Sequence, residues 1–245
     1  MKAIRRMTQT VAAVLLIFSM TVLHISAAPA YDAERNEENV RELLEEYDPE
    51  GYYIIQTTIE MGGSPISKYL GSNPSLPRTV DTVVHEMFHN YTYVKNGSSK
   101  QFRESGPFDT KDFKTLEDWD NFFNSFTVNI ETIYMGKEKG DVIIEYPYAD
   151  SANYKSENFA KNLPEELRTF RYDTYVCENA VASANIDGVY GLINEYGAYH
   201  WGFHNQLALY PYYKANSGYE DFFSGCMTNY QAYEEFRFWF LGLLN

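Results

Sequence analysis

The chain has 245 residues, of which 44% are hydrophobic and 22% are charged, proportions that exclude an intrinsically disordered chain and a collagen-like repeat. Its 34 acidic residues outnumber its 20 basic residues, giving a formal net charge of −14. Nucleic acids and anionic lipids are bound by basic surfaces, so this balance argues against both as partners.

The first thirty residues have the three-part pattern of a secretory signal peptide. Three basic residues precede a mostly apolar run at 11–23, and small residues at 26–30 offer cleavage sites. The apolar run is shorter than the roughly 18–20 residues of a bilayer-spanning helix, which argues against a retained membrane anchor. We therefore expect residues 1–30 to be removed, and the mature chain 31–245 to be a single secreted domain without a membrane partner.

The predicted elements begin with two helices. Apolar residues with helical spacing predict an acidic helix over 33–47. Asp48 and Pro49 then predict the start of a second helix, because aspartate caps helix N-termini and proline suits the first turn. Residues 52–61 are rich in β-branched side chains and could form either helix or strand, of which helix is favoured. Glycines and prolines then predict a loop over 62–77.

A buried helix and a β-hairpin are expected next. Apolar residues cover most sides of 79–93, so this helix is expected to be buried, and the polar run at 96–99 is expected to end it. Two strands, at 127–135 and 141–148, flank a turn with glycine at each end, which is typical of a hairpin. The other helices are expected near 116–126, after Leu163, over 173–199 with a break at Asp187-Gly188, and over 228–244. The mature chain is thus predicted to be α+β and mainly helical.

The motif His85-Glu86-Met87-Phe88-His89 lies within the buried helix and carries the clearest chemical signal. Histidines four residues apart lie one turn apart on one face of a helix, so both imidazoles can bind one metal ion. Glu86 lies about 100° around the helix axis, where it can take a proton from a metal-bound water. The alternative is a pair of histidines hydrogen-bonded within the core. That alternative is costly, because each buried polar group needs a partner.

This motif resembles the active-site helix of the zincin metallopeptidases, in which two histidines bind Zn²⁺ and the glutamate is the general base. The metzincin branch continues with glycine and histidine at positions that are Thr92 and Lys95 here, so that branch is excluded. The gluzincin branch takes its third ligand from an Asn-Glu step on a later helix, and Asn194-Glu195 is similar to that step. The resemblance therefore implies Glu195 as the third ligand, with Glu178 as the alternative.

Two features depart from the gluzincin pattern. The hairpin lies between His89 and Glu195, so the resemblance implies a zincin-like core with the hairpin inserted between the two metal-binding helices. Thermolysin-like members have aspartate four residues after the ligand glutamate, where this chain has Tyr199. The Tyr199 hydroxyl could take over the orienting of a zinc-bound imidazole, or it could face the substrate as a donor to the oxyanion of a tetrahedral intermediate. His200 and His204 could each supply a metal ligand or a donor to that oxyanion. For both, the alternative is an ordinary surface or core histidine, and for His204 this alternative is favoured.

The resemblance implies a secreted zinc metallopeptidase with one Zn²⁺ ion, acting on a peptide or protein substrate. In this interpretation Glu86 activates the zinc-bound water. Two other functions are open at this point. One is a non-catalytic extracellular binding protein on a zincin-like scaffold, and the other is a zinc amidase that acts on a cell-wall polymer.

The two cysteines, Cys177 and Cys226, leave two interpretations open. Export permits a disulfide between them, because disulfides persist in oxidising compartments. Two buried thiols without a disulfide are equally compatible with the sequence.

Overall fold

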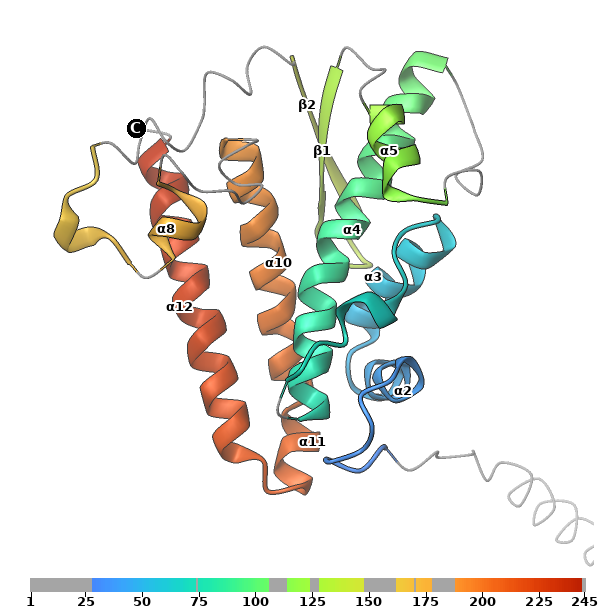
Figure 1. Ribbon diagram of the computed structural model, residues 1–245, viewed down its shortest axis with the longest axis vertical. Coiled ribbons are helices and arrows are strands. Elements are labelled where there is room, and N and C mark those ends of the chain that lie inside the picture. The colour runs from blue at the N-terminus through green and yellow to red at the C-terminus, as the bar shows by residue number, and fades with distance from the viewer. Residues whose placement is uncertain are drawn as a thin grey trace, which may run out of the picture.

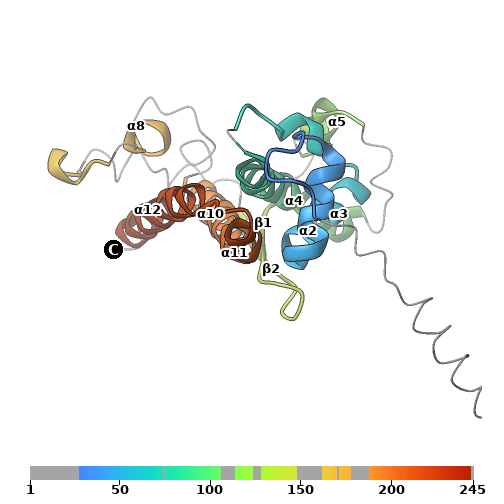
Figure 2. The same ribbon diagram turned by 90° about the horizontal axis from the view of Figure 1, so that it is seen from below.

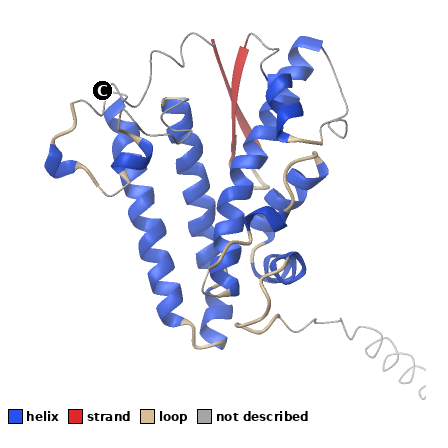
Figure 3. Cartoon of the chain, in the orientation of Figure 1, coloured by secondary structure: helices blue, strands red, loops and turns tan. Residues whose placement is uncertain are grey.

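The fold is seen in a computed structural model that describes residues 28–73, 75–105, 114–123, 128–147, 162–169, 171–177 and 188–243. This part of the chain is mainly helical, with one small antiparallel sheet, as predicted (Figures 1 and 3). In chain order the elements are α2 (Glu37–Tyr47), α3 (Pro49–Glu60), η1 (Ile66–Tyr69), α4 (Leu76–Ser105), α5 (Leu116–Phe123), β1 (Val128–Tyr134), β2 (Asp141–Pro147), η3 (Glu165–Leu167), α8 (Tyr172–Tyr175), α10 (Val189–Ala208), α11 (Tyr210–Ala215) and α12 (Tyr219–Leu243).

The expected signal peptide falls almost wholly on residues 1–27, outside the described residues, and so does Glu178. Among the helices that are described, none combines the length and the hydropathy that a bilayer span requires.

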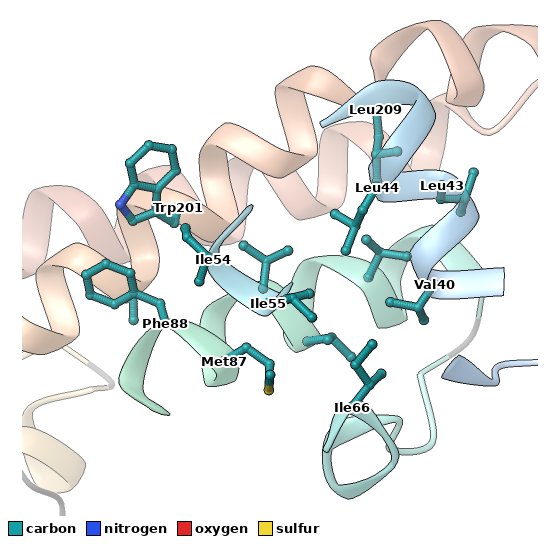
Figure 4. Close-up of a cluster of buried hydrophobic side chains, with 14 of the residues drawn as sticks. Val40, Leu43, Leu44, Ile54, Ile55, Ile66, Met87, Phe88, Trp201 and Leu209 are labelled. Carbon is teal, nitrogen blue, oxygen red and sulfur yellow. The ribbon is translucent and has the colours of Figure 1, made fainter. Parts of the chain in front are cut away.

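Three long helices form the body of the protein. α12, α10 and α4 lie side by side, and α2 and α3 pack against α4 (Figures 1 and 2). α3 begins at the predicted place, where the Asp48 carboxylate accepts the N–H of Gly51 at 3.0 Å. Figure 4 shows part of the apolar core that α2, α3 and α4 share, including Val40, Leu43, Leu44, Ile54, Ile55 and Met87.

The helix that carries the histidine motif is longer than the sequence predicted. α4 continues through the polar run at 96–99 and ends at Ser105, so the expected end of the helix was wrong. The reason is tertiary: the Asn96 amide donates to Glu131 of β1 at 3.2 Å, and the Lys100 ammonium donates to Asn129 at 3.1 Å. These contacts with the sheet offset the low helix propensity of asparagine, glycine and serine.

The hairpin is confirmed, and it falls between α4 and α10 in the chain. β1 pairs with β2 in antiparallel register from Val128↔Pro147 to Tyr134↔Asp141. The ring of Tyr134 lies 5.0 Å from that of Trp201 on α10 and 5.4 Å from that of Tyr91 on α4. The hairpin therefore packs against both α4 and α10.

Close approach of α10 to α4 depends on a glycine. A Cβ on Gly197 would lie 2.6 Å from the ring of Phe88, a distance that side chains do not tolerate. α10 begins directly after Gly188, whose φ of 62° favours glycine, and the rest of the expected break lies outside the described residues. These two glycines set where α10 starts and how closely it approaches the histidine helix.

No disulfide joins Cys177 and Cys226 in the structure. The Cys177 thiol lies just after α8 and donates to the Asp173 carbonyl at 3.1 Å, whereas Cys226 lies on α12. The structure therefore has no bridge, and the two cysteines are partly exposed rather than buried.

Candidate metal centre

Three side chains that were predicted as metal ligands meet between α4 and α10. The Nε2 atoms of His85 and His89 are 3.4 Å apart, and Glu195 Oε2 lies 3.5 Å from His89 Nε2 and 3.9 Å from His85 Nε2. Ligand atoms at about 2.0–2.1 Å from a tetrahedral Zn²⁺ are about 3.3–3.4 Å from one another. The three donor atoms thus have nearly the spacing that such an ion requires, and they could hold one metal ion.

The charge of this cluster also suits a cation. Burial lowers the pKa of His85 to about 3, so at neutral pH its imidazole is uncharged and can donate a lone pair. Burial lowers the pKa of His89 too, but the hydrogen bond and the charge of Glu195 outweigh it, and the pKa is raised overall. The buried Glu195 carboxylate therefore attracts positive charge to this point, which a metal ion can supply in place of a proton.

Both histidines are held by hydrogen bonds that leave their Nε2 atoms directed at the cluster. His89 Nδ1 bonds to the side-chain oxygen of Asn194, and the Asn194 amide donates to Glu131 at 2.9 Å. His85 is bonded to the backbone of Ala198. Partners of this kind fix the ring orientation and the tautomer of metal-binding histidines. The roles of Asn194 and Glu131 were not predicted from the sequence, although the Asn-Glu step pointed to this place on α10.

An open cleft of about 470 Å³ lies over the three ligands. Glu86 borders it beside the two histidines, and burial raises the pKa of the Glu86 carboxyl. The other side is formed by side chains of α8 and α10, among them Tyr175 and Tyr190. We call this space the metal cleft. It brings a carboxyl group with an increased proton affinity next to the candidate metal position.

Tyr175 was not a candidate in the sequence analysis, but it borders the metal cleft. Burial, and to a smaller extent the charge of Glu195, raises the pKa of the Tyr175 phenol. The phenol therefore stays protonated and can donate a hydrogen bond. Tyr199 lies behind the ligands, with its ring 4.5 Å from that of His85 and its hydroxyl 3.4 Å from that of Tyr175. Tyr199 is therefore placed to support His85, whereas Tyr175 borders the cleft.

His200 does not border the metal cleft, contrary to the expectation. It is five residues after Glu195, which turns it about 140° around the helix axis. Its exposed ring lies 5.2 Å from that of Trp201. His204 lies farther along α10, with its Nδ1 3.3 Å from the carboxylate of Asp48, the residue that caps α3. Neither histidine is brought to the candidate metal position.

Comparison of the chain with family models, with curated proteins and with solved structures finds no match.

Proposed function

We propose that the protein is a secreted zinc-dependent metallopeptidase with a gluzincin-like site. The observation that carries the proposal is the group of His85, His89 and Glu195, with Glu86 beside it in an open cleft. Two imidazoles and one carboxylate are the donor set of many catalytic zinc sites, in which a fourth position is left for water or substrate. A structural zinc site is instead closed by four protein ligands, usually including cysteine.

A bound zinc ion would supply Lewis acidity toward the scissile carbonyl and lower the pKa of a water molecule. In the proposed mechanism Glu86 accepts the proton of the attacking water and then delivers it to the leaving amine. Its raised pKa suits this task, since a general base works best when its pKa is near the working pH. Asn194 and Glu131 hold His89 in position.

The developing oxyanion needs a donor, and Tyr175 is the side chain we assign to this role. It borders the cleft, it is close enough to Glu195 to feel its charge, and it remains protonated at neutral pH. Removal of one oxyanion donor typically lowers kcat about 10²- to 10³-fold. Tyr175→Phe is therefore expected to lower kcat strongly while changing KM little.

The test combines a metal measurement with a turnover measurement on purified full-length protein. Wild type and Glu86→Gln are expected to retain about one zinc per chain, and His89→Ala to lose it. Hydrolysis of unfolded protein is expected to fall at least about 100-fold in Glu86→Gln, because the general base is lost while the metal stays.

The outcomes separate this function from the two alternatives. Full hydrolysis by Glu86→Gln would contradict the mechanism. Bound zinc with turnover of cell-wall fragments but not of peptides would indicate an amidase. Protein that hydrolyses neither substrate would indicate a binding function for the same fold.

A further inference from the structure

A second hollow, of about 310 Å³, lies next to the metal cleft, and Tyr93 of α4 borders both. Asn90 and Val94 border only the second hollow. On a helix, residues 90 and 94 lie farther around the axis from the metal ligands than Glu86 and Tyr93 do. The second hollow therefore begins on the far side of Glu86, within reach of a substrate that occupies the metal cleft.

The outer wall of this hollow is a loop held firmly against the helices. The N–H of Gly62, whose φ is 85°, donates to the Ile59 carbonyl at 3.0 Å, and the N–H of Gly63 donates to the Thr58 carbonyl at 2.8 Å. A Cβ on Gly63 would lie 2.5 Å from the methyl group of Thr58 and 3.4 Å from Val94. The two glycines thus allow the loop to pack directly on α3 and α4, and the wall is part of the helical body.

The charged side chains that border this hollow are two lysines, Lys68 and Lys114, and we call it the lysine hollow. Neither lysine forms an ion pair with a carboxylate of the described chain, whereas Lys95 pairs with Asp141 at 3.0 Å. Asp118 is close to Lys114, and its carboxylate accepts backbone N–H groups at the start of α5, at 2.8 and 3.0 Å, but it does not border the hollow. In a chain with a net charge of −14, this is a local site of positive charge.

We propose that the lysine hollow is a substrate subsite that takes a carboxylate of the peptide. This inference rests on the proposed peptidase function and adds a specificity to it. Tyr93 is one helical turn beyond His89, about 6 Å along α4, and an extended peptide advances about 3.3 Å per residue. The subsite therefore receives a group about two residues from the scissile bond. That group is either an acidic side chain or the C-terminal carboxylate.

The experiment measures peptide binding separately from turnover. Zinc-loaded Glu86→Gln protein is titrated into labelled alanine-rich peptides, and fluorescence anisotropy is recorded. One series has blocked ends and a single glutamate moved along the chain, a second has glutamine in its place, and a third has a free C-terminal carboxylate. At one position the glutamate peptide is expected to bind about fivefold more tightly than its glutamine counterpart for each lysine that it contacts.

Charge-reversal variants assign this preference to the hollow. Lys68→Glu and Lys114→Glu are each expected to reduce it. Lys139→Glu is the matched control, since Lys139 is exposed in the hairpin turn and borders neither hollow. Tighter binding of the third series alone would identify the terminal carboxylate as the ligand.

Equal binding of all three peptide series, or no peptide binding at all, would overturn the subsite. So would a preference that survives both lysine variants. The wild type could hydrolyse no peptide while the protein still shows an acidic preference that depends on the lysines. That result would support the subsite and contradict the peptidase function. If the wild type hydrolyses peptides but has no acidic preference, the subsite is contradicted and the peptidase function is not.

Discussion

Replacement of Asn194 tests whether the hydrogen bonds behind the ligands set the metal affinity. Asn194→Ala removes the acceptor for His89 Nδ1 and also the amide that donates to Glu131 at 2.9 Å. Loss of a partner that orients a metal-bound histidine typically lowers metal affinity about 10- to 100-fold. The expected increase in the zinc Kd lies toward the upper end of that range, because the buried Glu131 carboxylate loses a donor as well.

The assay is competition for zinc between the protein and a chromophoric chelator at fixed pH. Urea unfolding of the metal-free variant, measured in parallel, shows how much of the effect comes from general destabilisation. Asn216→Ala is the matched control, since the Asn216 amide donates to a backbone carbonyl at 2.9 Å at an exposed position. A zinc Kd for Asn194→Ala within about twofold of the wild-type value, with the fold intact, would refute the reasoning.

Two further predictions concern stability. Gly197→Ala is expected to lower the free energy of unfolding by about 1–3 kcal/mol in urea denaturation, because the added Cβ would meet the ring of Phe88 at 2.6 Å; an unchanged midpoint would contradict the close packing of α10 on α4. Burial raises the pKa of Asp81 from 3.8 to about 7, so the folded state favours the protonated carboxyl. The stability that this protonated group contributes is therefore lost as the pH rises from about 4 to 7. Asp81→Asn should therefore gain stability relative to wild type over that interval, and a stability difference that is constant with pH would contradict the prediction.

Much of the fold was predicted from the sequence because it depends on local interactions. The start of α3 at Asp48 and the hairpin between residues 128 and 147 follow from capping and from turn chemistry. The position of His85 and His89 on one helix face is likewise local, since it requires only that residues 85–89 are helical. These features are confirmed in the structure.

Other features depended on contacts between segments far apart in the chain. The end of α4 at Ser105 is set by bonds from Asn96 and Lys100 to β1, which no local pattern along α4 reveals. The position of Tyr175 in the metal cleft depends on how α8 packs, and periodicity does not report that. His200 does not border the metal cleft, because closeness in sequence to Glu195 does not put a side chain on the same helix face.

By itself, the sequence determined which residues can bind a metal and that two of them share a helix face, because the spacing of a helix is a property of the backbone. The tertiary structure alone decided that Glu195 meets this face, through the close approach that Gly197 allows. It also decided that Asn194 and Glu131 orient His89. The physical reason is that such contacts depend on how the helices and the hairpin pack, and packing is determined by the whole chain at once.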